Sequence, residues 1–319
     1  MSSPTSRVVA GREITFPVPV VSASVSGAAF LTRAAVVRRL IAAGRQSAVL
    51  DAAGAEPVAL PGGRTPAIMI HVRYHDVPGN VLGAYHEMGV AFQLKVPGHG
   101  TLVHIHELPV DQDFTLAAGN ELWGFPKWKG DMVGTAGGAL DDARLGAVGS
   151  AGAGGVDLRL DTRVGVPIPG SQSLAMNCVQ VLDGQPVRVT AEATARGGRM
   201  RPLSGARVTI ATGADDSDAD VARFAEAVRE LGLDRARALA TFSYDRFEAE
   251  FQAPERIGVA EQHRERGDSA HTLRVADEPL QHVGGWVDRG ERIGVVRADQ
   301  VGEDQDRHRD PDRSAPGGQ

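Results

Sequence analysis

Residues 121–129, which read ELWGFPKWK, decide the fold and the chemistry that we expect of this chain. They place Lys127 directly after a proline and among the bulky side chains of Trp123, Phe125 and Trp128. Proline fixes its own φ and is disfavoured inside a helix, so the segment is predicted to be extended or turned. The stretch therefore mounts a lysine on a stiff backbone with apolar rings around it.

Such a lysine is a candidate Schiff-base nucleophile. Only a neutral amine attacks a carbonyl, and a free lysine, with a pKa near ~10.4, is almost entirely charged at pH 7. Burial against the rings penalises the ammonium, and a second cation at Lys129 would penalise it further. In an extended segment residues two apart share a face, which puts Lys127 and Lys129 on one side and Trp128 on the other. The alternative interpretation is that both lysines are solvated on a strand edge and the aromatic residues form an ordinary core.

Residues 119–127 resemble the active-site motif of the acetoacetate decarboxylase family, Gly-Arg-Glu-Leu/Ile-x-x-Phe/Tyr-Pro-Lys, with Asn120 in place of the arginine. In that family the lysine after the proline forms the iminium, and acetoacetate decarboxylase is the usual example of a lysine activated by desolvation or by a neighbouring cation. The resemblance implies that Lys127 is the catalytic nucleophile. The residues expected to tune its protonation or to line its pocket are Lys129, Trp128, Trp123 and Phe125.

Two upstream segments extend the resemblance to roughly residues 15–257. Residues 85–89, YHEMG, are similar to the family's Tyr-x-Glu-x-Gly, whose glutamate reaches into the active site. The resemblance therefore implies that Glu87 is a second catalytic residue, which assists protonation or orients water. Residues 104–111, HIHELPVD, lie before the lysine as in relatives, which implies that His106 lines the pocket.

The resemblance also implies a fold and an activity. The fold would be a β-rich α+β domain with a cone-shaped closed β-barrel, flanking antiparallel sheets and a few helices, and the lysine would lie inside the barrel. The activity would be that of a carbon–carbon lyase that decarboxylates a small β-keto acid through an iminium and enamine on Lys127, without a cofactor. Relatives assemble into homo-oligomers, so the same is expected here.

Three departures from the family pattern favour the Schiff base on Lys127 over decarboxylation as its outcome. The family's second lysine, directly after the nucleophile, is Trp128 here. Its substrate-side arginine falls near Ala23, with Arg12 too far upstream to replace it, and a further glutamate falls near Ile70. A Schiff-base aldolase or dehydratase of secondary metabolism is therefore a second hypothesis. A third is a barrel that binds an apolar ligand without turnover, with Lys127 extending to the surface.

Composition agrees with a soluble enzyme. The chain has 319 residues, of which 42% are hydrophobic, so it can bury a sizeable core. Its formal charge of −6 does not indicate the positively charged surface that nucleic-acid binding requires. No stretch is long and apolar enough to span a membrane. The single cysteine, Cys178, excludes an intramolecular disulfide and suits the cytoplasm. We expect Cys178 to be a small buried apolar residue.

Periodicity in the sequence predicts strands and two helices. Apolar residues alternate with other residues over 68–74 and 90–96, a pattern typical of half-buried antiparallel strands. One helix is predicted from Thr32 as N-cap to Ala43, ending at Gly44. Another is predicted from Ser217, with a Ser-x-x-Asp cap. Its buried face would consist of Val221, Phe224, Val228 and Leu231.

The chain is predicted to have three parts. Residues 1–14 form a flexible N-terminus, residues 15–257 the enzyme domain, and residues 258–319 a polar, largely disordered extension that is either genuine or translated out of frame. His104 and His106 share a strand face and are followed by Glu107, but no further ligands follow at a recognisable spacing, so we expect no metal site.

Overall fold

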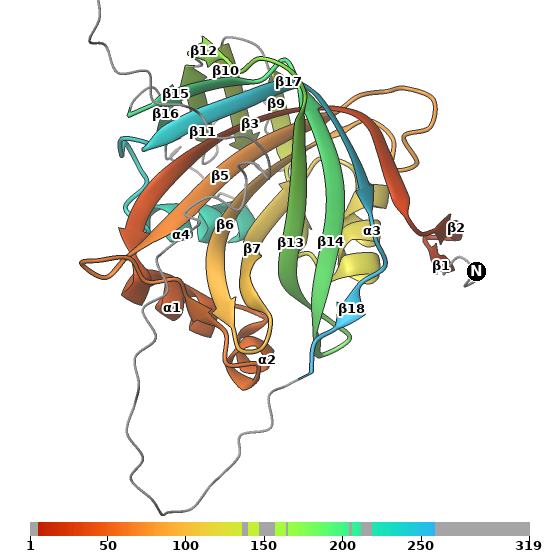
Figure 1. Ribbon diagram of the computed structural model, residues 1–319, viewed down its shortest axis with the longest axis horizontal. Helices are drawn as coiled ribbons and strands as arrows, with labels where there is room; N and C mark the ends of the chain where they lie inside the picture. The colour runs from red at the N-terminus through yellow and green to blue at the C-terminus, as the bar shows by residue number, and fades with distance from the viewer. Residues whose placement is uncertain are drawn as a thin grey trace, which may run out of the picture. The chain divides into compact units, whose positions relative to one another are not determined.

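A closed seven-stranded barrel dominates the fold (Figure 1). The computed structural model describes residues 6–135, 140–146, 157–163, 165–203, 206–211 and 219–258. In order around the barrel, the strands are β3 (Val18–Arg33), β5 (Arg64–Tyr74), β6 (Tyr85–Val96), β7 (Gly100–Val110), β13 (Gln172–Leu182), β14 (Gln185–Arg196) and β17 (Ala240–Phe251). The barrel closes because β17 pairs with both β14 and β3.

Neighbouring barrel strands are antiparallel except at one seam. There β7 and β13 run parallel, with Cys178 opposite Val103. Parallel neighbours need a crossover connection, and the chain between them supplies α3 (Asp113–Trp123) and β8 (Lys127–Lys129). Strand β8 pairs with β7 in parallel, so that Leu108 lies opposite Lys127. The crossover therefore brings the lysine segment to the barrel wall.

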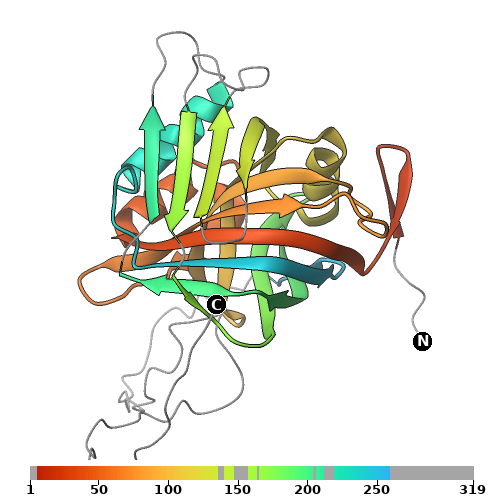
Figure 2. The same cartoon turned by 90° about the horizontal axis from the view of Figure 1, so that it is seen from above.

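Short strands and a second sheet flank the barrel. The second sheet has the antiparallel order β16 (Ala206–Ala211), β11 (Asp157–Arg163), β10 (Leu140–Gly146) and β9 (Asp131–Thr135), and Figure 2 shows α4 (Ala219–Glu230) beside it. The short strands are β1 (Ser6–Val9), β2 (Arg12–Thr15), β4 (Glu56–Pro57), β12 (Val166–Pro167), β15 (Arg199–Pro202) and β18 (Glu255–Arg256). The remaining helices are α1 (Ala34–Ala43) and α2 (Ser47–Ala52).

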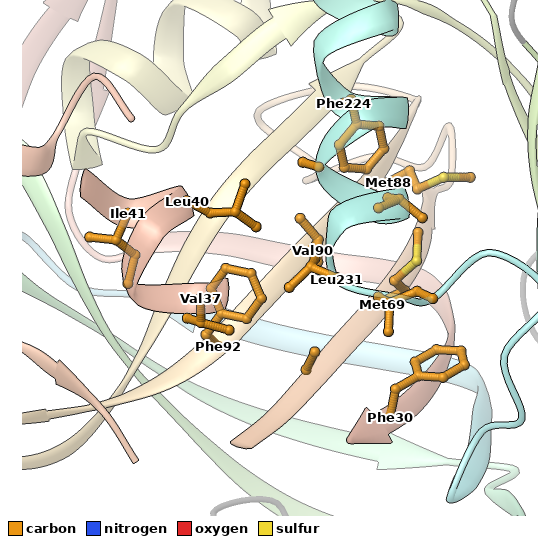
Figure 3. Packing of buried hydrophobic residues seen from close by; sticks show 14 of the residues in the cluster. Phe30, Val37, Leu40, Ile41, Met69, Met88, Val90, Phe92, Phe224 and Leu231 are labelled. Carbon is orange, nitrogen blue, oxygen red and sulfur yellow. The ribbon is translucent and has the colours of Figure 1, made fainter. Parts of the chain in front are cut away.

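The buried apolar residues form an inner and an outer cluster, one on each face of the barrel sheet. Alternation along β5 gives Met69 to the outer cluster and Val72 to the inner one. Figure 3 shows the outer cluster, where Phe224 of α4 and Leu40 of α1 cover the outer face of the barrel strands. Both faces of these strands are covered by protein, and the inner cluster surrounds the lysine described below.

These observations confirm the predicted fold class of a closed barrel with flanking antiparallel sheets and few helices. Helix α4 buries the predicted residues Val221, Phe224 and Val228, whereas its predicted start at Ser217 lies outside the described residues. Helix α1 ends at Gly44 as predicted, but its N-cap is Arg33. Thr32 still belongs to β3, and its hydroxyl donates to the Leu231 carbonyl instead of capping the helix.

The described part of the chain includes residues upstream of the predicted domain boundary at residue 15. Within residues 1–14, which were assigned to a flexible N-terminus, strands β1 and β2 pair as a hairpin with Val9 and Ile14 buried. The predicted extension over 258–319 lies outside the described residues from 259 onward. Among the helices of the described segments, none has the length and hydrophobicity needed to cross a bilayer.

Candidate active site

A tight turn between α3 and β8 positions Lys127. Helix α3 ends at Gly124, whose left-handed φ of 70° is the conformation that glycine adopts most readily. A Cβ at Gly124 would overlap the Val181 carbonyl, so the turn can lie against β13 only because this residue has no side chain. The amide of Leu108 then donates to the Pro126 carbonyl at 3.3 Å, which starts the pairing of β8 with β7.

Two residues of α3 constrain the backbone and the aliphatic stem of Lys127. The side chain of Asn120 binds both backbone groups of Lys127, since it donates to the carbonyl at 3.2 Å and accepts from the amide at 3.3 Å. A Cβ at Gly119 would overlap the aliphatic stem of Lys127. Asn120 stands where the family motif has arginine, and this contact with the backbone of Lys127 was not predicted from the sequence.

The amine of Lys127 is buried and has three polar or aromatic neighbours. Its side chain is only 5% exposed. Nζ donates to Glu87 Oε2 and to Thr115 Oγ1, each at 3.1 Å, and lies 5.2 Å from the centroid of the Tyr85 ring. The two opposite charges compensate each other in surroundings that would strongly destabilise either charge alone.

Tyr74 holds the glutamate, and Tyr85 packs against Tyr74. The hydroxyl of Tyr74 donates to Glu87 Oε1 at 2.8 Å, and its ring stacks on Tyr85 with centroids 4.0 Å apart. Burial, and then the charge of Glu87, raises the pKa of both tyrosines well above their usual value. They therefore remain protonated hydrogen-bond donors at neutral pH.

The cavity beside the amine is small and apolar. Its volume is about 80 Å³, and it lies within the inner cluster. Trp123 and Phe125 line it as predicted, and both pack against Phe251 of β17. The structure thus brings Lys127, Glu87, Trp123 and Phe125 together around one cavity.

Trp128 and His106 lie elsewhere, on the outer face of the barrel sheet. They line a second cavity of about 470 Å³ that is also bordered by residues of α1, α2 and α4. Trp128 Nε1 donates to Glu107 Oε2 at 2.7 Å, and Arg223 of α4 binds the same carboxylate through contacts of 3.0 and 3.1 Å. Lys127 borders both cavities, but its amine points to Glu87, so the predicted packing of Trp128 on the amine is wrong.

A bulge in β7 accounts for the position of His106. Val90 lies opposite Glu107 and Ala91 opposite Ile105, so β7 carries one extra residue at 106. Ile105 therefore lines the inner cavity, while His106 and Glu107 line the outer one. His106 therefore borders a cavity that Lys127 also borders, but not the inner cavity beside the lysine amine.

Lys129 is paired outside the cavity. Its Nζ lies 2.8 Å from Asp113 Oδ1, and the side chain of Asp113 is 89% exposed. Its charge is thus compensated by a solvated carboxylate at the start of α3. This arrangement does not favour the predicted role of Lys129 as a second cation beside Lys127.

Metal and thiol chemistry find no support in the described part of the chain. It contains no group of three or more His, Cys, Asp or Glu residues that could hold a metal ion. Burial lowers the pKa of His104 to about 3, and it also lowers that of His106. Cys178 is buried and its pKa is raised by burial to about 12, which agrees with a structural residue and not with a nucleophile.

Comparison with solved structures shows where this architecture occurs. The enduracididine biosynthesis enzyme MppR, in complex with the condensation product of pyruvate and imidazole 4-carboxaldehyde, is 15% identical with a TM-score of 0.50, and the match covers 80% of this chain and 97% of that chain. Acetoacetate decarboxylase from Legionella pneumophila is 14% identical with a TM-score of 0.49, over 76% and 87% of the two chains. Another acetoacetate decarboxylase is 14% identical with a TM-score of 0.48, over 76% and 90%. At such identities the likeness shows the fold alone.

Sequence comparison identifies the region that holds the site. No curated protein matches the chain. The family model described as acetoacetate decarboxylase matches residues 55–158, which include both Glu87 and Lys127. The resemblance to the acetoacetate decarboxylase family is confirmed over residues 55–158, where the model of that family matches the chain.

Proposed function

We propose that this protein is a carbon–carbon lyase that works through a Schiff base on Lys127. The observation that carries the proposal is the placement of the Lys127 amine 3.1 Å from the Glu87 carboxylate beside an apolar cavity inside a barrel. A nucleophilic amine needs a nearby base and exclusion of water, and these residues supply both.

The first step forms the iminium. Glu87 takes a proton from Lys127, and the neutral amine attacks the carbonyl carbon of the substrate. The carbonyl oxygen then leaves as water, after it has received one proton from the nitrogen and one from Glu87. The product is a protonated imine whose positive charge lies beside the Glu87 carboxylate, in the place of the original ammonium.

The second step breaks a bond beta to the imine nitrogen. The electron pair of that bond moves into the iminium and gives an enamine. In a β-keto acid the departing group is carbon dioxide, which is the decarboxylation predicted first from the sequence. In a β-hydroxy carbonyl compound an aldehyde leaves and Glu87 takes the hydroxyl proton, which is the aldol-type alternative. Protonation of the enamine carbon and hydrolysis of the imine complete both reactions.

A ligand-binding barrel without turnover agrees less well with these contacts. That hypothesis requires Lys127 to extend to the surface, whereas its side chain is 5% exposed and ion-paired. Homo-oligomer formation and a cytoplasmic location stay predictions from the sequence.

Borohydride trapping tests the Schiff base directly. The protein is incubated with a panel of small ketones, aldehydes and keto acids, reduced, digested and analysed by mass spectrometry. We expect a stable adduct on the peptide that contains Lys127, and none there in Lys127→Met, which keeps the length of the side chain but has no amine. Lys129→Met is the matched control and should keep the adduct, since Lys129 is paired with Asp113 away from the cavity. An adduct that persists in Lys127→Met, or none with any carbonyl compound, would contradict the proposal.

A further inference from the structure

We infer that the Lys127 site takes a small, uncharged ketone or aldehyde in preference to a keto acid. The inference rests on the proposed Schiff-base function and names its substrate class. It is carried by the walls of the inner cavity, the pairing of its two charges and its volume.

Apart from Lys127, Glu87, Tyr74 and Tyr85, the walls are apolar, and the hydroxyl of Tyr74 already donates to Glu87. The apolar walls are formed by aliphatic, aromatic and thioether side chains from six of the barrel strands and the α3 turn. Among them are Val20, Val25, Ile70, Ile105, Met176 and Phe247. Side chains of this kind cannot donate a hydrogen bond to a carboxylate, so bringing one into contact with them forfeits its hydration without replacement.

The two charged groups that line the cavity already neutralise each other. Lys127 Nζ donates to Glu87 Oε2, and the other oxygen of Glu87 accepts from Tyr74. With an uncharged substrate the iminium replaces the ammonium and the site remains neutral. With a keto acid, the substrate carboxylate would compete with Glu87 for the one cation and lie beside a like charge.

The volume of the cavity points to the same class. The cavity is small, about 80 Å³, and so favours small compounds over larger ones. Acetone and propanal have four non-hydrogen atoms, whereas pyruvate has six and acetoacetate seven. Charge and size thus favour the same compounds independently.

An uncharged ketone has a definite fate at this site. After imine formation, Glu87 can take a proton from the carbon next to the imine, and the electrons of that C–H bond form the enamine. Return of a proton regenerates the ketone, so the protein should exchange the α-hydrogens of acetone with solvent. Attack of the same enamine on a second carbonyl compound is the aldol reaction, and its reverse is aldol cleavage.

Competition between probes in one trapping experiment tests the substrate class. Acetone, propanal, pyruvate and acetoacetate are supplied at equal concentration with borohydride, each with a different number of carbon-13 atoms among the carbons that stay on the lysine. The labels assign each adduct on the Lys127 peptide to its probe, including an acetoacetate adduct that has lost carbon dioxide. We expect at least about tenfold more adduct from acetone and propanal than from either keto acid, because a carboxylate in this cavity loses its hydration and lies beside the charge of Glu87. In parallel, proton NMR in heavy water should show loss of the acetone methyl signal with the wild-type protein and not with Lys127→Met.

A cavity-enlarging variant separates charge from size. Met176→Ala shortens a side chain that lines the cavity on β13. If charge excludes keto acids, this variant should accept longer uncharged ketones such as 2-hexanone while pyruvate and acetoacetate remain poor probes. Keto-acid adducts that equal those of the ketones, in the wild type or in Met176→Ala, would overturn the inference and leave the Schiff base intact. The absence of every adduct and of exchange would overturn the proposed function, and the inference with it.

Discussion

The proposed role of Glu87 requires its carboxylate to stay beside the Lys127 amine, and Tyr74 holds it there through a hydrogen bond of 2.8 Å to the second oxygen. Tyr74→Phe removes this donor and keeps the ring that stacks on Tyr85. A hydrogen bond to a charged group contributes about 1.5–3 kcal/mol, so we expect the rate of adduct formation on Lys127 to fall by roughly tenfold or more. Tyr244→Phe, a matched change on β17 at a residue that does not line the inner cavity, should leave the rate unchanged. Equal rates in both variants would show that Tyr74 does not position the carboxylate.

The residues of the site differ in how readily the sequence reveals them. Lys127 and Glu87 lie in short motifs, so they were predicted, and alternation correctly separated Lys127 from Trp128. Tyr74 reaches Glu87 from β5, and Thr115 reaches the amine from the first turn of α3; nothing local distinguishes them from ordinary strand and helix residues. The role of Tyr74 arises from its pairing with Tyr85 across β5 and β6, which a single sequence does not specify.

At the scale of elements, the junction between α3 and β8 depends on one glycine, and a second glycine provides its control. Gly124 and Gly232 both follow helices with left-handed φ values of 70° and 69°. An alanine at Gly232 would meet nothing within 4 Å, so Gly232→Ala should cost about 1 kcal/mol of stability from backbone strain alone. Gly124→Ala adds the overlap with the Val181 carbonyl, so we expect a loss larger by about 1–3 kcal/mol and a lower trapping yield at Lys127. Urea unfolding measures the loss of stability, and mass spectrometry of the Lys127 peptide measures the trapping yield. Similar losses of stability in the two variants would contradict the overlap with the Val181 carbonyl as the cause.

Elements were predicted correctly where a periodic sequence pattern determines them, and less well where contacts with distant residues determine them. The apolar face of α4 was predicted because Val221, Phe224 and Val228 follow the helical period. The start of α1 was not, because Thr32 uses its hydroxyl on the Leu231 carbonyl from a distant part of the chain. The bulge at His106 moved that residue to the outer cavity, and no local signal in the sequence indicates an extra residue in β7.

For the whole molecule, burial of histidines predicts a loss of stability in acid. Burial, followed by the charge of His106, lowers the pKa of His104 from 6.5 to about 3. Between pH 6.5 and 3 the unfolded chain therefore binds a proton at this residue that the folded chain does not. Stability from His104 is complete above pH 6.5 and falls as the pH falls, by up to about 1.4 kcal/mol per pH unit. Urea midpoints between pH 7 and 4 should consequently change less steeply in His104→Gln than in the wild type, and parallel curves would contradict this account.

The order of the barrel strands also determines when the site can exist. Strand β17 closes the barrel against β3, so that Ala240 pairs with Ala29. During synthesis, β3 and β5 emerge long before their last partner, and β3 keeps a row of unpaired amides and carbonyls until β17 arrives. Folds that depend on contacts between such distant segments form slowly, and until then their unpaired strand edges can pair with other chains. Production of active protein should thus depend on temperature and on chaperones more than its final packing suggests, since Lys127 is shielded from water only after the last long strand is in place.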